Sequence, residues 1–128
     1  ELAGVPNIQN VGFQRGQALE NLIRQARFSV YPSQWYENCP FSVMESQLYG
    51  TPVLGADIGG IPELIEEGKT GELFESGNPG QLKEKIEKMW ENRELTEQYT
   101  ENCANLRFDD VHAYTEKLLK LYRGETLC

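Results

Sequence analysis

Short apolar segments alternate with amphipathic stretches along the first part of the chain, which is the pattern of successive β-α units. The predicted strands are Ile8–Gly12, Phe28–Tyr31, Pro52–Gly55 and Glu72–Phe74. Helices are predicted between them, over residues 16–26, 41–50 and 59–68. The sequence therefore predicts an α/β fold with a parallel sheet.

The remainder of the chain has only helical periodicity. Asn78 and Pro79 form a helix start signal. Leu82, Ile86, Met89 and Trp90 are then predicted to form its buried stripe. A second helix is expected around residues 95–106 and a third over 111–121, the latter begun by the acidic pair Asp109 and Asp110. The apolar stripe of the third helix is predicted to be Val111, Tyr114, Leu118 and Leu121. We expect these trailing helices to follow the sheet.

Composition narrows the possible partners. The chain has 128 residues, enough for one domain with a core, and its net charge of −8 argues against nucleic acid as a partner. Three cysteines and one histidine, His112, form neither a disulfide framework nor a metal-ligand cluster. No apolar run is long enough to span a membrane. We therefore expect a cytoplasmic domain without metal or cofactor.

Two glutamates flank the predicted start of the helix at Phe41. The apolar stripe of this helix is predicted to contain Phe41, Met44 and Leu48. At 100° per residue, Glu45 lies about 40° from Phe41, beside this stripe, and leans toward the helix start. A phosphate could dock there on the free N–H groups of Phe41, Ser42 and Val43. Glu45 could then accept hydrogen bonds from a ribose diol, and Glu37 from hydroxyls beyond the phosphates.

Two other interpretations of this pair are open from spacing alone. A glutamate in the first turns of a helix is stabilised by the helix dipole and needs no ligand. Alternatively, the two carboxylates could be the acid and nucleophile of a retaining glycosidase, which stand about 5–5.5 Å apart.

The surrounding motif distinguishes these possibilities. The segment E-N-C-P-F-S-V-M-E, with "SQLYGTPVLGADIGGIPELIEEGKTGELF" after it, resembles the signature of the retaining GT-B glycosyltransferases in the glycosyl transferases group 1 family, family 4. The likeness extends from residue 7 to about residue 90. It implies a Rossmann-like donor-binding domain, of which residues 1–128 would be the second half. The N-terminal acceptor domain and the first strands of this domain would be absent.

The resemblance also implies roles for particular residues. Glu45 would bind the ribose, and Glu37 would contact the donor sugar near the reacting centre. Residues implied to contact the donor elsewhere are Asn38, Cys39, Phe41, Ser42, Val43, Phe13, Gln14, Gly59 and Gly60. Transfer would retain the anomeric configuration without a divalent metal. The acceptor would be a glycan, a lipid-linked molecule or another acceptor, as in polysaccharide biosynthesis, and the full-length enzyme could associate with a membrane.

Some positions depart from that pattern or have a simpler explanation. Many family members have glycine where this chain has Asn38, Cys39 and Pro40, and Pro40 supplies no N–H. Cys39 is predicted to be a small filler residue. Trp35 and Tyr36 could stack on a ligand or pack over the sheet edge, and Gly59 and Gly60 also suit an ordinary strand-to-helix turn.

Two alternative functions accompany the glycosyltransferase interpretation: a non-catalytic nucleotide-sugar-binding or regulatory module, and an α/β interaction domain. We expect the chain alone to transfer no sugar, because the acceptor surface would be missing. Without two intervening strands, Ile8–Gly12 and Phe28–Tyr31 are expected to pair, giving a four-stranded sheet in sequence order. Its bare edge could also support a homodimer.

Overall fold

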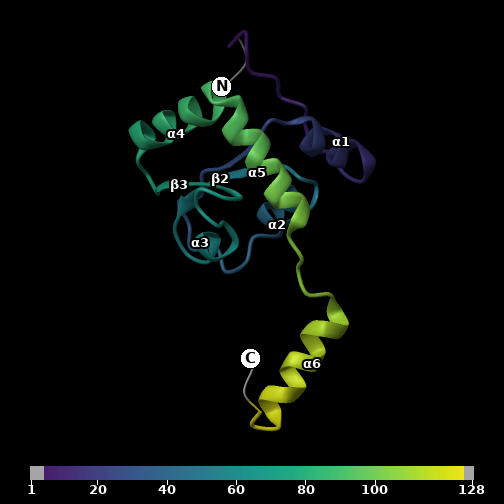
Figure 1. The fold of residues 1–128 in the computed structure, drawn as a ribbon. Coiled ribbons are helices and arrows are strands. Elements are labelled where there is room, and N and C mark those ends of the chain that lie inside the picture. The colour runs from purple at the N-terminus through teal and green to yellow at the C-terminus, as the bar shows by residue number, and fades with distance from the viewer. Residues whose placement is uncertain (1–4, 126–128) are drawn as a thin grey trace.

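The computed structural model describes residues 5–125 and has an α/β fold, which confirms the predicted class (Figure 1). Its strands are β1 (Ser29–Tyr31), β2 (Val53–Asp57) and β3 (Gly71–Glu75). Its helices are α1 (Gln17–Gln25), α2 (Phe41–Leu48), α3 (Ile61–Leu64), α4 (Pro79–Glu91), α5 (Arg93–Asn105) and α6 (Val111–Tyr122).

The sheet is parallel, in the order β1-β2-β3. The predicted first strand is wrong: residues 8–12 lie outside the sheet, and Ile8 and Val11 are exposed. Local hydrogen bonds hold this segment instead, including one from the Gly12 amide to the Asn10 side chain at 2.9 Å. The expected four-stranded sheet is therefore wrong too, and within residues 5–125 the outer edge of β1 pairs with no strand.

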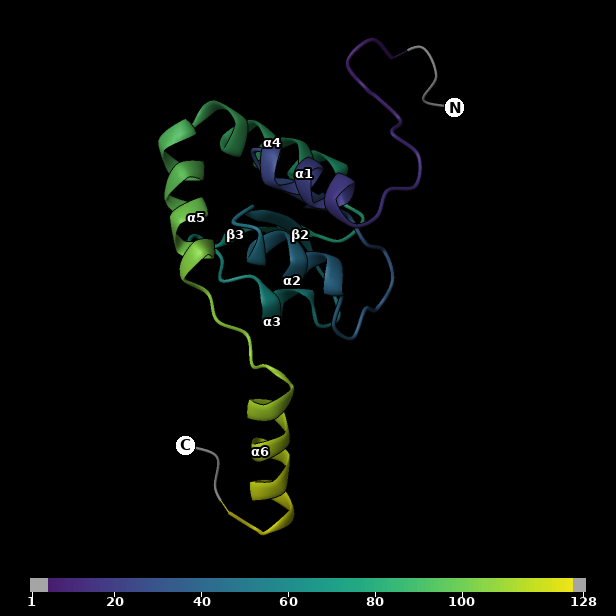
Figure 2. The same ribbon diagram turned by 90° about the vertical axis from the view of Figure 1, so that its right-hand side faces the viewer.

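Helices cover both faces of the sheet. In two perpendicular views α1 and α4 lie on one side, and α2 and α3 lie on the other (Figure 2). The α4 side contains a core cluster of Leu54, Ala56, Phe74, Met89 and Tyr99. The α2 side contains Val43, Val53, Ile61 and Ile65. Each helix layer thus shields one face of β2, the central strand, in which every residue except Asp57 is buried.

The predicted caps explain where the trailing helices begin. The Asn78 side chain accepts a hydrogen bond from the Gln81 amide, and Asp110 accepts one from the Ala113 amide. Asn92 caps α5 in the same manner. Trp90, however, was predicted to be buried and is 62% exposed, whereas its neighbour Met89 is fully buried. Trp90 instead faces the Arg27 guanidinium, 5.3 Å from its ring centre.

A buried carboxylate ties β3 to the helices above it. The Glu72 side chain is 1% exposed and accepts hydrogen bonds from Lys85 Nζ at 2.7 Å, Lys88 Nζ at 2.6 Å and the Tyr99 hydroxyl at 2.6 Å. Burial alone would raise the pKa of Glu72, but these hydrogen bonds outweigh burial and lower it. Burial and the bond to Glu72 raise the pKa of Tyr99. Sequence reasoning did not predict this network.

The last helix stands apart from the sheet and its covering helices, joined by an extended linker (Figures 1 and 2). Every residue of α6 is exposed, including the predicted apolar stripe of Val111, Tyr114, Leu118 and Leu121. In residues 5–125, no helix is both long and apolar enough to cross a membrane.

Candidate functional site

Two loops meet at the carboxyl ends of β1 and β2, where parallel sheets usually bind ligands. The first loop contains Glu37 and Asn38, and the second contains Gly59 and Gly60. The Gly60 amide donates a hydrogen bond to the Glu37 carbonyl at 2.7 Å, which fixes one loop against the other.

Only glycine fits where these loops touch. A Cβ on Gly60 would lie 1.9 Å from the Asn38 carbonyl oxygen, and one on Gly59 would lie 2.4 Å from the Glu37 oxygen. Gly59 also has a φ of 60°, which side-chain-bearing residues rarely adopt. The backbone of Gly59 and Gly60 therefore lies close to the loop that carries Glu37. Their contact with a donor stays a prediction.

A hollow of about 380 Å³ lies over this junction. It is lined by Tyr36, Glu37, Asn38, Gly59, Gly60 and Glu63. Glu37 is half-buried and Glu63 is exposed, so two carboxylates border a space also lined by a phenol and an amide. Such groups can accept hydrogen bonds from hydroxyls. Glu63 was missed as a site residue, although it lies in the Gly-Gly-Ile-Pro-Glu motif.

The start of α2 lies next along the chain and has two free amides. Its N-cap is the buried Pro40, which has no side-chain acceptor. The Val43 amide donates to the Pro40 carbonyl at 3.0 Å. The amides of Phe41 and Ser42 have no acceptor among residues 5–125. The predicted anion site therefore has two amides available in place of three.

The orientation of α2 differs from the predicted one. Its buried residues are Val43, Ser46 and Gln47, whereas Phe41 and Leu48, assigned to the apolar face, are exposed. The Ser46 hydroxyl meets the Ser29 hydroxyl at 2.8 Å, and the Gln47 amide donates to Thr70 at 3.1 Å. These partners make burial of the polar face favourable.

This orientation leaves Glu45 exposed, on the open side of the helix. It forms no ion pair with another residue of the described chain. Among residues 5–125, neither glutamate of the motif has an ion-pair partner; Glu37 lies in the hollow and Glu45 lies one turn inside α2.

The aromatic residues of this region are exposed. Trp35 is 79% exposed and Tyr36 is 87% exposed, so neither packs over the sheet edge. Phe13 is 90% exposed, and the Gln14 side chain donates to the Val11 carbonyl. Neither Phe13 nor Gln14 lines the hollow beside Glu37. Their predicted contact with a base stays a prediction.

Cys39 is exposed, so its predicted role as a packed filler is wrong. Its sulfur lies 3.6 Å from the Met44 sulfur, which places the loop against the outer side of α2. His112 lies on α6 and is exposed.

Solved structures support the architecture. The Anabaena protein HepE, solved in complex with UDP, matches with a TM-score of 0.71 and 27% identity, over 80% of this chain and 29% of that one. The α/β domain described above thus has the fold of GT-B glycosyltransferase structures.

Curated relatives and a family model agree with the structural match. The chain is 31% identical over 96 residues to a glycosyltransferase of Methanocaldococcus jannaschii, covering 75% of this chain and 27% of the relative. It is 27% identical over 95 residues to the alpha-D-kanosaminyltransferase of Streptomyces kanamyceticus, covering 74% and 24%. The chain thus spans about a quarter of these relatives' lengths. The model for "Glycosyl transferases group 1" matches residues 2–105, and the chain belongs to this family.

Proposed function

We propose that this chain is part of the C-terminal, donor-binding domain of a retaining glycosyltransferase that uses a nucleotide-diphosphate sugar. The observation that carries the proposal is the pair of unpaired glutamates on either side of the uncapped start of α2. Similarity to a protein solved with UDP, and with UDP and glucose, supports the choice of a nucleotide-sugar donor.

The proposed donor position follows from these groups. The diphosphate lies at the free amides of Phe41 and Ser42, where the helix dipole favours negative charge. Glu45 accepts hydrogen bonds from the ribose diol. The sugar extends into the hollow beside Glu37, whose carboxylate accepts hydrogen bonds from its hydroxyls.

The proposed reaction replaces one bond at the anomeric carbon. The bond to the diphosphate oxygen breaks, a bond to the acceptor oxygen forms on the same face, and the leaving phosphate takes the acceptor proton. Glu37 assists by positioning the sugar at the reacting centre. An acceptor, either a glycan or a lipid-linked molecule, would be held by a part of the enzyme outside this chain.

Two substitutions test this assignment in the complete enzyme. Glu45→Gln should weaken nucleotide binding in calorimetry by about 1.5–3 kcal/mol, the range for charged hydrogen bonds. Glu37→Ala should lower turnover far more than nucleotide affinity. Glu84→Gln, which removes an exposed glutamate of α4, is the control for charge. Unchanged affinity in Glu45→Gln, measured against UDP, GDP and ADP, would remove the ribose assignment.

Two exposed aromatic residues, Tyr36 and Trp35, lie at or next to the hollow proposed to hold the sugar. Tyr36 lines the hollow, and Trp35 precedes it with its ring open to solvent. Aromatic faces pack against the apolar faces of sugar rings. Tyr36→Ala should therefore raise KM for the sugar nucleotide more than it weakens binding of the free nucleotide, and equal losses would contradict this placement.

The non-catalytic alternative makes a different prediction. A binding module would respond to Glu45→Gln in nucleotide affinity but would transfer no sugar even as the complete protein. Measured transfer by the complete protein, together with none by the 128-residue chain, supports the proposed enzyme. Transfer by the chain alone would contradict the proposed separation of donor and acceptor surfaces.

A further inference from the structure

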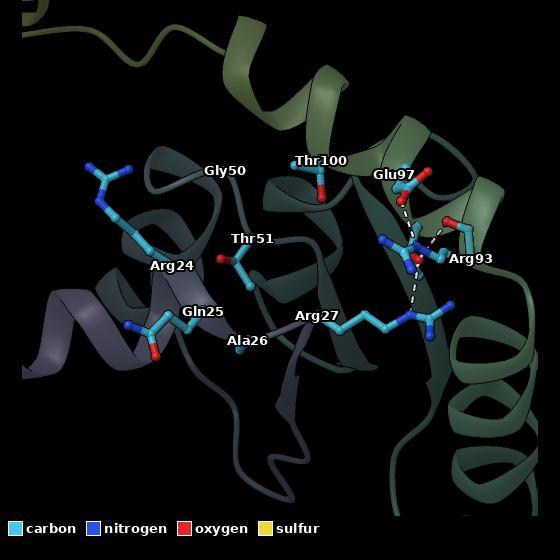
Figure 3. A pocket seen from close by; sticks show the side chains of 10 residues that line it. Arg24, Gln25, Ala26, Arg27, Gly50, Thr51, Arg93, Glu97 and Thr100 are labelled. Atoms are coloured by element: carbon cyan, nitrogen blue, oxygen red, sulfur yellow. Dashed lines mark hydrogen bonds and ion pairs between the residues drawn. The ribbon is translucent and has the colours of Figure 1, made fainter.

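The opposite end of the sheet has a second pocket, of about 370 Å³ (Figure 3). Its walls come from the segment before β1, the turn before β2 and the first turns of α5. The lining residues are Arg24, Gln25, Ala26, Arg27, Gly50, Thr51, Arg93, Thr96, Glu97 and Thr100. Because these segments precede the strands, the pocket lies at the amino ends of β1 and β2, away from Glu37.

The charge of this pocket is opposite to that of the chain. Three arginines and one glutamate line it, in a protein with a net charge of −8. Two arginines have carboxylate partners: Arg24 pairs with Glu20 at 2.8 Å and Arg93 pairs with Glu97 at 2.7 Å. The positive charge that remains belongs to Arg27.

Arg27 is half-buried and has no carboxylate within salt-bridge distance in residues 5–125. Its Nε donates to the Thr96 hydroxyl at 3.2 Å, and its guanidinium faces Trp90. Its Nη2 is buried without a hydrogen-bond partner in the described chain. A half-buried guanidinium with unused donors is costly unless an anion or water meets it.

The neighbouring groups suit an anion. Figure 3 shows Arg27 extending toward Arg93 on one side of the pocket, with the Thr100 side chain entering from α5. Arg93 is the first residue of α5, where the helix dipole also favours negative charge. Of these two guanidinium groups, Arg93 pairs with Glu97 and Arg27 has no carboxylate partner in residues 5–125, so a bound anion would balance the charge of Arg27.

We propose that this pocket binds a phosphate group through Arg27, Arg93 and Thr100. The planar guanidinium of arginine binds phosphate oxygens through paired N–H donors. The phosphate could belong to a small molecule or to a lipid headgroup, and the tests below distinguish these sources. This site is separate from the donor site and does not depend on the proposed glycosyl transfer.

Trp90 provides a direct measurement, because it lies against Arg27. The chain has two tryptophans, and Trp35→Phe leaves Trp90 as the single reporter. Titrating this variant with inorganic phosphate and diphosphate should change Trp90 fluorescence in a saturable manner. Phosphate bound at the start of α2 would not produce this signal, which separates the two sites.

Three substitutions in the same background test the assignment. Arg27→Gln should weaken phosphate binding by about tenfold or more, as loss of charged hydrogen bonds predicts. Arg27→Lys should restore part of the affinity. Lys83→Gln, which removes an exposed positive charge from α4, is the matched control and should change binding by less than about twofold.

Glu97→Gln should have the opposite effect. It removes the carboxylate that occupies Arg93 and competes with the anion, so phosphate binding should tighten several-fold. A pocket with only a structural role would show no such gain. Thermal unfolding of each variant, followed by circular dichroism, confirms that the fold persists.

Vesicles containing phosphatidic acid, compared with neutral phosphatidylcholine vesicles, identify the source of the phosphate. A Trp90 response to the anionic vesicles alone assigns a lipid headgroup, and a response to free phosphate assigns a small molecule. Lack of a saturable response to all of these probes would overturn the proposal, as would equal binding by Arg27→Gln and its parent.

Discussion

Glu72 and Glu45 lie on opposite sides of the same sheet and have opposite surroundings. On the α4 side, Glu72 is buried and accepts hydrogen bonds from two lysines and a tyrosine. On the α2 side, Glu45 is exposed and has no ion-pair partner in the described residues. A carboxylate whose acceptors are occupied stabilises the fold, whereas one with free acceptors is available to a ligand. The difference separates the structural side of this domain from its proposed binding side.

The largest expected effect is on the structural side. Glu72→Gln leaves Lys85 and Lys88 beside a neutral amide in a buried position, which should reduce the free energy of unfolding by about 3–5 kcal/mol. Glu45→Gln should change it by less than about 0.5 kcal/mol. Urea unfolding of the two variants checks the contrast. Lys88→Met, which removes a half-exposed partner of Glu72, should reduce the free energy of unfolding by less than Glu72→Gln does. Equal losses for Glu72→Gln and Glu45→Gln would contradict the contrast between the two glutamates.

Acid should remove the same stabilisation gradually. The pKa of Glu72 is lower in the folded chain than its ordinary value of 4.5, because hydrogen bonds from Lys85, Lys88 and Tyr99 outweigh burial. The unfolded chain therefore binds this proton more readily, and the stabilisation is complete above that ordinary value. It is lost as the pH falls through the lowered pKa. Unfolding curves of the parent and Glu72→Gln should converge on acidification, whereas a constant difference between them would contradict this account.

Gly60→Ala should have an intermediate effect on stability and a large one on binding. The added Cβ would lie 1.9 Å from the Asn38 carbonyl, so the loop carrying Glu37 must move. We expect a loss of about 1–3 kcal/mol in unfolding free energy, typical of overpacking, together with weaker nucleotide-sugar binding. Gly80→Ala is the control, because its Cβ would be 3.4 Å from the Asn78 side chain and its helical backbone accepts alanine. If both variants bind donor equally, the loop junction does not position the site.

The smallest expected effect is on the exposed side of α2. Leu48→Gln should alter stability by less than about 0.5 kcal/mol, since the side chain is already exposed. Val43→Ala, on the opposite face of the same helix, removes buried methyl groups and should cost about 1–2 kcal/mol. Thermal unfolding distinguishes the two. A larger loss for Leu48→Gln would restore the helix orientation predicted from the sequence.

The sequence predicts local features, such as helix caps, more reliably than it predicts which side of a helix is buried. Asn78 and Asp110 begin the helices they were expected to cap, because a cap depends on neighbouring residues alone. The face of α2 was predicted incorrectly, because burial of Ser46 and Gln47 depends on Ser29 and Thr70, which lie far away in sequence. Similarly, residues 8–12 have strand-like composition, but a strand also needs a neighbour to bond with.

For the candidate site too, positions along the chain can be predicted from the sequence, whereas contacts between distant segments cannot. The motif places Glu37 and Glu45 near the start of α2, and this placement is visible in the sequence. The contact between Gly60 and the Glu37 carbonyl is not, because it joins two loops only once the sheet has formed. The buried state of Glu72 and the pocket around Arg27 arise from contacts across the fold in the same way.

Because α6 stands apart from the rest of the fold, it should differ from the rest of the chain in amide hydrogen exchange and in sensitivity to proteases. A helix of 12 residues that are all exposed to solvent is only marginally stable in water. Its amides should therefore exchange with deuterium far faster than those of β2, and limited proteolysis should cut first in the linker near residues 106–110. The protected product would end close to residue 105, where the match to the family model also ends.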